Sequence, residues 1–355
     1  MQMAWRRTVT ALATAVTVLV LAGCGTASSA MPGDGTTSAP FTSSEETASS
    51  SSGPASSGSG GQDGGMSDHA TSQDAGASSF YRAPTSVDAA LQRARDEGRD
   101  DDAALIERIA SQPIAVWLNG GDAAIAEAAA VSQAATASGQ IALFVVYNIP
   151  GRDCGLYSAG GAEESEYLAW VERVAEVLAE GGTTWVVLEP DGLASLGDCD
   201  GQGDRVGFLG GAAAILDAAG ARVFLDVGHS GWQSADEIAD RIRRVGTEHL
   251  AGFATNTSNY NATADEQAWG DQVAAKVGLP FVVDTSRNGN GSNGEWCNPR
   301  GRALGENPGL TGEAAGMVAR VWTKVPGESD GTCNGGPAAG AWWEEIALEL
   351  ARNAG

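Results

Sequence analysis

The sequence predicts a single α/β domain built from parallel βαβ units, and three observations support this prediction. Seven short apolar runs recur along residues 79–355, and several are bounded by Pro or Gly, as buried parallel strands are. Segments with helical spacing, rich in Ala, Glu and Leu, lie between these runs. The span also has the length of one β/α barrel. The periodicity of the sequence does not show whether the sheet closes into a barrel. An open doubly wound sheet fits the same pattern nearly as well.

Residues 1–23 are predicted to be a lipoprotein signal peptide. Two arginines precede an apolar stretch from about residue 9 to residue 21, which is short for a membrane-spanning helix. The Leu-Ala-Gly-Cys segment that ends at Cys24 resembles the bacterial lipobox. We therefore expect a secreted protein that is lipidated at Cys24 and anchored on the outer face of the bacterial cell membrane. The alternative is ordinary signal cleavage next to an incidental cysteine.

Residues 24–78 are predicted to be the lipidated cysteine followed by a disordered linker. The segment from residue 25 to residue 78 contains no Lys or Arg and is crowded with Ser, Gly, Ala and Thr. Such a composition buries too little apolar surface to fold, so it is typical of a flexible tether. The folded domain is then residues 79–355.

The net charge restricts the class of partner. The whole chain carries −24, and removing the two arginines of the signal peptide leaves 19 − 45 = −26. This charge argues against nucleic acid, anionic lipid and anionic polymers as partners. A neutral substrate is compatible with it, and the only membrane contact that we expect is the lipid anchor.

Seven strands are predicted at the apolar runs. Each run is short and is dominated by aliphatic and aromatic residues, as strands buried in a sheet are. The predicted strands are residues 113–119, 141–147, 184–189, 222–226, 251–255, 280–284 and 319–325.

Helices are predicted between these strands. The segment after the first strand is Ala-rich and therefore a strong helix former. Ser234 and Glu237 have the spacing of a capping box, and Thr263 stands where an N-cap is expected. The predicted helices include residues 122–138, 164–180, 208–219, 234–244 and 263–277.

Four cysteines follow Cys24, and an even number in an exported chain predicts two disulfides. Three pairings are possible. We favour Cys154 with Cys199 and Cys297 with Cys333, because each pair joins loops at neighbouring edges of the candidate site. Zinc is a weak alternative, since the chain has no CxxC pair and only three histidines. We expect neither a metal nor an organic cofactor.

Acidic, amide and indole side chains gather where the predicted strands end. Asp153 and Asp191 follow the second and third strands, and Asp226 ends the fourth. In β/α folds, catalytic groups lie just beyond the C-terminal ends of the strands. A single Asp at such a position is more often a helix cap or turn former. Together, however, these residues predict a carbohydrate-binding cleft with carboxylate-pair chemistry, of which glycoside hydrolysis is the best-known case.

Seven strand-end blocks resemble glycoside hydrolase family six, the 1,4-β-glucanases or cellulases of bacteria and fungi. The resemblance extends in order over about residues 80–355. It implies a distorted, seven-stranded parallel β/α barrel of the TIM type as a single catalytic domain at residues 79–355, and the same two disulfides. The blocks begin at Tyr147, Glu189, Asp226, Asn256, Asp284, Glu295 and Lys324.

The resemblance implies a role for each matching residue. Asp191 is the general acid, whose pKa must be raised so that its proton survives near neutral pH, and Asp153 raises it and relays the proton. Asp330 is the candidate base, roughly 6.5–9.5 Å from the acid in an inverting enzyme. Tyr147 crowds the sugar and favours its distortion, and Asp226 is a further active-site acid. The implied sugar-binding residues are Trp117, His229, Trp232, Asn256, Trp296, Trp322, Lys324 and Glu328.

The predicted function is therefore that of a monomeric, inverting endo-1,4-β-glucanase that acts on cellulose or a related β-glucan. The loops around Asp191 and before Asp330 are short, which indicates an open cleft and internal cutting. The segment after Trp117 departs from the family pattern at one binding edge. One alternative is a non-catalytic surface lipoprotein that binds β-glucan oligosaccharides. Another keeps the mechanism and changes the polymer to mixed-linkage glucan or xylan.

Overall fold

The computed structural model describes residues 79–355. The predicted signal peptide, the lipidation site at Cys24 and the linker lie outside the described residues. Within residues 79–355, none of the helices is both long enough and apolar enough to cross a membrane.

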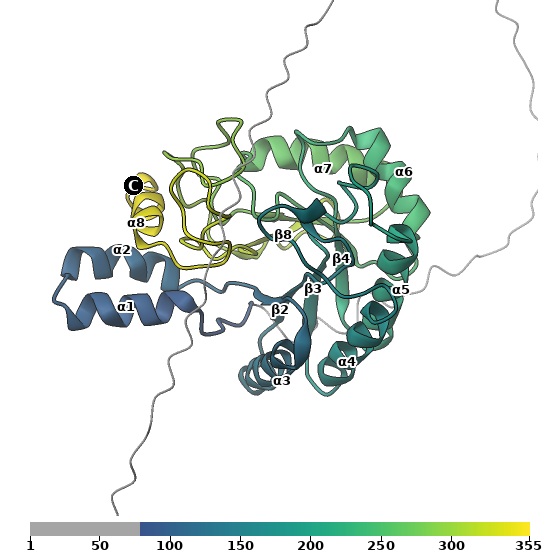
Figure 1. The fold of residues 1–355 in the computed structure, drawn as a ribbon, viewed down its shortest axis with the longest axis horizontal. Helices are drawn as coiled ribbons and strands as arrows, with labels where there is room; N and C mark the ends of the chain where they lie inside the picture. The colour runs from purple at the N-terminus through teal and green to yellow at the C-terminus, as the bar shows by residue number, and fades with distance from the viewer. Residues whose placement is uncertain (1–78) are drawn as a thin grey trace, which may run out of the picture. The chain divides into compact units, whose positions relative to one another are not determined.

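An eight-stranded sheet forms the centre of the described domain (Figure 1). Its strands follow the order β1-β2-β3-β4-β5-β6-β8-β7. All neighbours are parallel except β7 and β8. The predicted strands are confirmed, with small differences at their ends. The strands are β1 (Val116–Leu118), β2 (Ala142–Val146), β3 (Thr184–Leu188), β4 (Arg222–Asp226), β5 (Gly252–Thr255), β6 (Phe281–Asp284), β7 (Gly309–Leu310) and β8 (Met317–Val321).

The sheet differs from the all-parallel, seven-stranded barrel that the resemblance implies. β7 is an additional strand of two residues, and it pairs antiparallel with β8 on the side away from β6. β1 and β8 are not paired as strands in this order. They meet through a backbone hydrogen bond of 2.9 Å, from the N–H of Ala115 before β1 to the C=O of Trp322 after β8, and through a bond of 2.6 Å from the indole N–H of Trp117 to the C=O of Thr323.

The predicted helices between the strands are confirmed, and they lie around the outside of the sheet (Figure 1). Ser234 Oγ accepts the N–H of Glu237 at 3.2 Å, as an N-cap should. The predicted cap Thr263 is wrong. Ala262 is the N-cap, and Thr263 is already helical, so its hydroxyl is free to accept from Asn288 Nδ2. The helices are α3 (Gly121–Ser138), α4 (Tyr167–Ala179), α5 (Arg205–Ala218), α6 (Ala235–Val245) and α7 (Thr263–Val277).

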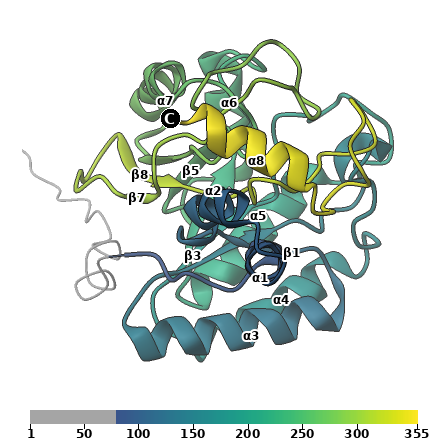
Figure 2. The same ribbon diagram turned by 90° about the vertical axis from the view of Figure 1, so that its left-hand side faces the viewer.

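Three further helices, absent from the prediction, pack together at one side of the sheet (Figure 2). They are α1 (Ser86–Asp96) and α2 (Asp100–Ala110) near the start of the domain, and α8 (Glu344–Asn353) at its end. Arg99 pairs with Glu344 at 2.7 Å, and Arg108 donates to the C=O of Ala351 at 2.8 Å. Apolar side chains of all three helices form one buried cluster with Trp322.

The two faces of the sheet have different apolar layers. The outer face packs against α3–α7. The inner face is covered by aliphatic side chains and by a few aromatic rings, with Trp185 between Phe80 and Phe224 at ring-centroid distances of 5.3 and 4.8 Å. Trp185 and Trp170 are both buried. Tyr147 belongs to the inner layer and follows directly on β2, so its ring lies where the core meets the strand ends.

Two disulfides join the loops that follow the strands. Cys154 is bonded to Cys199 and Cys297 to Cys333, so the favoured pairing is confirmed. The first bond links the loop after β2 to the loop after β3, and the second links the loops after β6 and β8. Each disulfide therefore cross-links two of the loops that carry candidate acids.

Candidate active site

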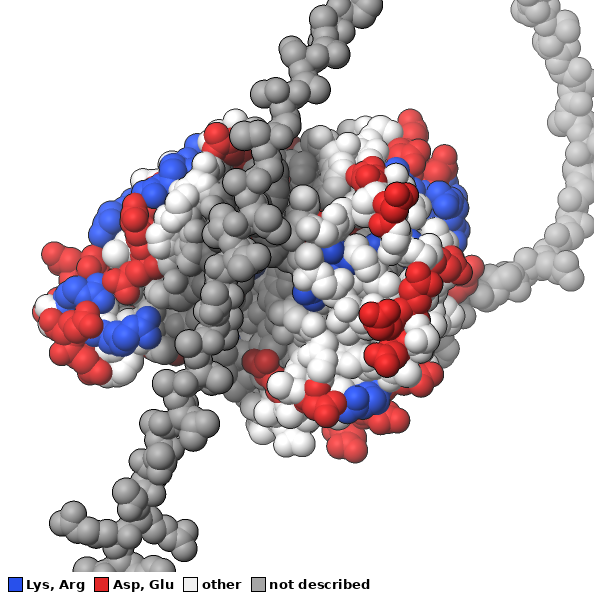
Figure 3. All heavy atoms as spheres, viewed as in Figure 1, with Lys and Arg blue, Asp and Glu red and all other residues white. Residues whose placement is uncertain are grey.

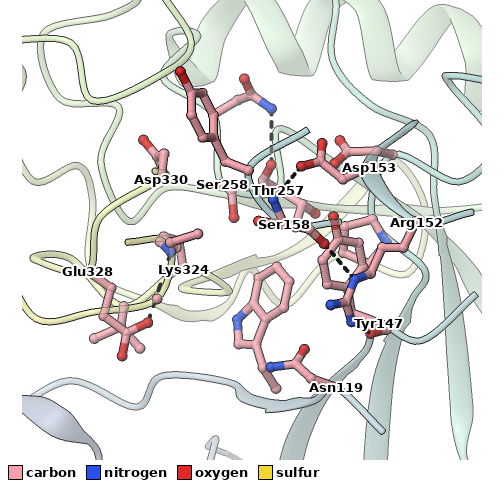
Figure 4. A pocket seen from close by; sticks show the side chains of 18 of the residues that line it. Asn119, Tyr147, Arg152, Asp153, Ser158, Thr257, Ser258, Lys324, Glu328 and Asp330 are labelled. Atoms are coloured by element: carbon pink, nitrogen blue, oxygen red, sulfur yellow. Dashed lines mark hydrogen bonds and ion pairs between the residues drawn. The ribbon is translucent and has the colours of Figure 1, made fainter. Parts of the chain in front are cut away.

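A cavity of about 850 Å³ opens at the C-terminal ends of the strands. Its lining comes from the loops after β1 to β6 and β8, together with the segment before α1. Most of the predicted site residues reach it, and in Figure 4 Tyr147, Arg152 and Asp153 lie on one side, opposite Lys324, Glu328 and Asp330. The predicted residues that line the cavity are Trp117, Tyr147, Asp153, Asp191, His229, Trp232, Trp296, Lys324, Glu328 and Asp330.

Asp191 stands on the tight turn after β3. Glu189 and Asp191 both have left-handed backbones, with φ values of 50° and 67°. This conformation costs a residue with a side chain on the order of 1–3 kcal/mol, so the surrounding contacts must stabilise the turn. Burial raises the pKa of Asp191 to about 8, and the charges of Asp226 and Asp153 contribute to the rise. The carboxyl group of Asp191 therefore retains its proton at neutral pH.

Asp226 contacts the site through the backbone of Asp191. Its Oδ1 accepts the N–H groups of Asp191 and Gly228, both at 3.0 Å. Burial raises the pKa of Asp226 to about 7, although these hydrogen bonds oppose the rise. Asp226 does not line the cavity and acts on the site through Asp191, so its role as a further active-site acid stays a prediction. Asp226 is the last residue of β4, a strand that is buried on both faces. Its carboxyl group therefore lies inside the domain, beneath Asp191.

Asp153 lies next to the first disulfide, in a loop with left-handed backbones at Asp153 and Cys154. Its Oδ2 accepts the N–H of Ser158 at 2.6 Å. Burial raises the pKa of Asp153, while this hydrogen bond and the positive charge of Arg152 lower it. The hydrogen bond and the disulfide hold Asp153 at the cavity, where its charge acts on Asp191.

Glu189 is a buried acid with no role predicted from the sequence. Its carboxylate accepts the N–H of Asn148 and of Ile149, both at 3.0 Å, and the hydroxyl of Tyr167 at 2.8 Å. Burial raises the pKa of Glu189 to about 7. These bonds connect the turn that carries Asp191 to the loop after β2. An acid directly after a fully buried strand is the signal that could have identified it.

Tyr147 is held between aromatic and cationic side chains. Its ring centroid lies 5.3 Å from that of Trp117, edge to face, and the guanidinium carbon of Arg152 lies 4.7 Å from it. Arg152 also donates to the C=O of Tyr147 at 2.6 Å. Burial, followed by the charges of Asp191 and Asp153, raises the pKa of Tyr147. The phenol therefore stays neutral beside the two acids.

Asp330 enters the cavity as part of a buried ion pair. Its Oδ1 lies 2.9 Å from Nη1 of Arg287, a residue only 2% exposed. Its Oδ2 accepts the hydroxyl of Tyr260 at 2.9 Å and the N–H of Asn298 at 3.0 Å. These three donors fix the position of the carboxyl group in the cavity wall. Arg287, Tyr260 and Asn298 were not predicted as site residues, because nothing in the local sequence indicates that they converge on Asp330.

Lys324 and Glu328 lie close together in the wall that contains Asp330 (Figure 4). Lys324 Nζ is 3.9 Å from Glu328 Oε2, and the two side chains are only 12% and 20% exposed, so this is not an exposed surface pair. Burial lowers the pKa of Lys324 and raises that of Glu328. Ser86 Oγ donates to Glu328 Oε1 at 2.8 Å, so the start of α1 supports this wall.

Aromatic side chains form two further parts of the lining. His229 and Trp232 have ring centroids 5.8 Å apart. Trp296 lies 6.0 Å from Tyr157, a cavity residue that the sequence analysis did not identify. Trp296 and Tyr157 are 51% and 47% exposed, so their rings are accessible to a large ligand.

Two predicted sugar-binding residues lie away from the cavity. Asn256 is fully buried, and its Nδ2 donates to the C=O of Asp284 at 2.8 Å, while its Oδ1 accepts the N–H of Asn261 at 3.1 Å. Trp322 is 1% exposed in the cluster of α1, α2 and α8, and its Nε1 donates to the C=O of Glu306 at 2.9 Å. Both are structural, because their polar atoms are already satisfied inside the domain.

Asp and Glu side chains lie mainly toward the edges of the face in Figure 3, with Lys and Arg side chains among them. Among residues 79–355, no group of three or more His, Cys, Asp or Glu side chains is arranged to hold a metal ion. The cavity is lined by carboxyl groups, indoles and other hydrogen-bonding side chains.

Comparison with known proteins links this geometry to a family. Residues 75–354 match the model for Glycosyl hydrolases family 6. Endoglucanase A of Cellulomonas fimi is 55% identical over 281 residues, which cover 78% of this chain and only 62% of that longer protein. Endoglucanase 1 of Streptomyces sp. (strain KSM-9) is 44% identical and covers 77% of each chain. The solved endoglucanase Cel6 of Mycobacterium tuberculosis, in complex with methyl-cellobiosyl-4-deoxy-4-thio-β-D-cellobioside, matches with a TM-score of 0.73 and 34% identity over 80% of this chain and 99% of that one.

Proposed function

The chain belongs to glycosyl hydrolase family 6, and on that premise we propose that it is an inverting endo-1,4-β-glucanase of cellulose or a related β-glucan. The observation that carries the proposal is Asp191, a carboxyl group with a pKa of about 8 in a cavity lined by indoles. A protonated carboxyl group at neutral pH is what an acid catalyst needs in order to protonate a leaving glycosidic oxygen.

Asp191 acts as the general acid in this proposal. Its proton goes to the glycosidic oxygen as the bond to the anomeric carbon breaks, and the sugar passes through an oxocarbenium-like transition state. Asp153 and Asp226 keep the pKa of Asp191 high through their charges. Asp153 also faces the cavity, where it can pass a proton from solvent back to Asp191 after each turnover.

Asp330 acts as the base, from the opposite wall of the cavity. Among the described residues, Oδ2 has two hydrogen-bond donors and Oδ1 has only Arg287. Oδ1 therefore keeps a lone pair for the water that attacks the anomeric carbon. Attack on the face opposite the leaving group inverts the configuration, so the β-linked polymer gives an α-anomer as its first product.

The remaining lining residues bind and distort the sugar. Trp117, Trp232 and Trp296 offer indole faces or edges to sugar rings, and Lys324 and Glu328 offer hydrogen-bonding groups to hydroxyls. Tyr147 lies among Trp117, Arg152 and the two acids, where it crowds the sugar at the reacting bond.

The exposure of the lining favours internal cutting. Leu156, Tyr157 and Trp296 line the cavity and are about half exposed, so this part of the site is open to solvent. An open site admits the middle of a polymer chain, whereas an enclosed one admits only its end. The names of the similar proteins from Cellulomonas and Streptomyces, both called endoglucanases, support the same conclusion.

The test is release of reducing ends from carboxymethylcellulose and amorphous cellulose. Asp191→Asn should lose about 10²–10⁴-fold in kcat because it removes the acid and keeps the shape of the side chain. The matched control is Asp200→Asn, which removes an exposed carboxylate from the same loop and should leave the activity unchanged. Proton NMR of the first product should show the α-anomer. An active Asp191→Asn variant, or a β-anomer, contradicts the proposal.

We also propose that the protein is exported and anchored through Cys24. The support is the sequence alone, in which an apolar stretch leads directly to a lipobox-like segment. Metabolic labelling with a fatty acid should mark the full-length protein and sediment it with the membrane fraction. Cys24→Ala should abolish the label, and an unlabelled wild type would reject the anchor.

A further inference from the structure

A buried carboxylate that the proposed mechanism does not use lies in the first turn of α7. Glu266 is fully buried, and its Oε1 accepts the N–H and the hydroxyl of Ser230 at 3.0 and 2.7 Å. The hydroxyl of Thr255 contacts its Oε2. A buried carboxylate is costly unless such donors compensate it, so this network specifies how α7 meets the loops after β4 and β5.

Glu266 determines which way the side-chain amide of Asn261 points. Asn261 Nδ2 lies 2.9 Å from Glu266 Oε1. The opposite orientation would place the amide oxygen against the carboxylate, where two acceptors would face each other. The NH₂ group of Asn261 is therefore directed to Glu266, and the same nitrogen lies 3.0 Å from Nδ1 of His229.

A second donor reaches the same nitrogen of His229. The backbone N–H of Gly231 lies 3.2 Å from His229 Nδ1, and a backbone N–H can only donate. With donors from both Asn261 and Gly231, Nδ1 has to be the acceptor, so the proton of the neutral ring resides on Nε2. His229 lines the cavity, and its Nε2 has no hydrogen-bond partner among residues 79–355.

We propose that Glu266 and Asn261 are positioning residues that hold His229 as the neutral Nε2–H tautomer, a hydrogen-bond donor for an oxygen of the bound sugar. The identity of the ligand rests on the proposed function, whereas the tautomer rests on the protein alone. An uncharged donor suits a hydroxyl or ring oxygen of a neutral sugar. Burial lowers the pKa of His229, against the opposing effect of the Glu266 charge, which also favours a neutral ring.

The tautomer can be read directly by NMR on the full chain. The protein has three histidines, so ¹⁵N-histidine labelling gives few imidazole signals, and His229→Gln identifies the one of interest. At pH 7 the wild type should show a protonated Nε2 and an unprotonated Nδ1. Asn261→Ala and Glu266→Gln should each increase the Nδ1–H population, because each disturbs the Asn261 donor. Asp265→Asn removes an exposed charge from the same turn of α7 and should leave the wild-type pattern.

Kinetics on soluble cello-oligosaccharides supply the second readout. Asn261→Ala should raise KM about fivefold, the effect of one weakened hydrogen bond, with a smaller change in kcat. Asn261 is only half-buried, so Asn261→Ala should still fold. It can therefore test the proposal if Glu266→Gln fails to fold. An Nδ1–H ring or an imidazolium in the wild type overturns the proposal, as does a tautomer that both variants leave unchanged.

The two proposals fail in different ways. An enzyme that hydrolyses β-glucan but contains an Nδ1–H His229 keeps the proposed function and rejects the positioning role. A protein that holds His229 as Nε2–H but neither cleaves nor binds any β-glucan overturns the assignment of the sugar oxygen as its acceptor, together with the proposed function.

Discussion

The backbone N–H of Asp191 donates a hydrogen bond of 3.0 Å to Oδ1 of Asp226. The same carboxylate that holds the backbone of the proposed acid also raises the pKa of its side chain. These two effects can be separated, because an asparagine at position 226 keeps an oxygen acceptor for the backbone and loses the charge.

Asp226→Asn should move the alkaline limb of the pH–rate profile to lower pH. In the wild type the limb should lie near pH 8, where Asp191 loses its proton. Without the negative charge of Asp226, ionisation of Asp191 is less opposed and its pKa falls. The measurement is kcat/KM against pH on a soluble substrate. Asp153→Asn should shift the limb in the same direction by less, and an unmoved limb in both variants would contradict the electrostatic role.

The protein should become less stable as the pH rises from about 4 to 8. Burial raises the pKa of Glu189 and Asp226 to about 7 and that of Asp191 to about 8, from 4.5 for Glu and 3.8 for Asp. Between these values the folded state binds more protons than the unfolded state, so stability falls with rising pH.

Asp191→Asn removes one of these groups and should flatten this dependence. Calorimetry should show a higher Tm than the wild type at pH 8, by roughly 2–4 °C for each kcal/mol of relieved charge burial, and little difference at pH 4. If Tm falls as steeply with rising pH in the variant as in the wild type, the buried acids do not determine the pH dependence of stability.

Arg287→Ala should destabilise the domain far more than Arg300→Ala. Arg287 is 2% exposed, pairs with Asp330 at 2.9 Å and stacks 4.3 Å from the ring centroid of Tyr260. Its loss leaves a buried carboxylate without its cation, at a cost of about 3–5 kcal/mol. Arg300 pairs with two glutamates at the surface, and its loss should cost less than about 1 kcal/mol. Urea unfolding checks the difference, and equal costs would refute it.

The two disulfides should have similar effects on stability and different effects on catalysis. Cys154 and Cys199 are separated by 45 residues and Cys297 and Cys333 by 36, so replacing either pair with serines should cost about 3–4 kcal/mol. Loss of the first pair frees the residue next to Asp153 and should change the alkaline limb. Loss of the second frees the residue next to Trp296 and should mainly raise KM. Steady-state kinetics of both double variants at several pH values tests this contrast.

The strands and the acids after them could be predicted because their signals are local. A buried parallel strand is a short apolar run, and the chain leaves it at a turn, so Asp153 and Asp191 could be placed from sequence. Proximity to a strand end does not specify the direction of a side chain. Asn256 and Trp322 also follow strands, yet their side chains turn into the domain, where Asp284 and Glu306 satisfy them.

The features that the sequence did not predict depend on residues that are distant in the chain. The helices α1, α2 and α8 are charged segments whose narrow apolar faces are stabilised mainly by one another. Glu189 and Glu266 look like ordinary acids in the sequence. Their roles appear only when the loops after β2 and β4 and the end of β5 supply their donors. The additional strand β7 has two residues, too few for any periodic pattern.

The packing of α1 and α2 against α8 also determines when the protein can finish folding. Arg99 and Glu344 are 245 residues apart, so at about 5–20 residues per second the ribosome completes α8 roughly 12–50 s after α1 and α2. Until then α1 and α2 can pack on each other but lack the apolar side chains that α8 adds to their cluster. The cluster of α1, α2 and α8 can therefore be completed only after α8 has been synthesised.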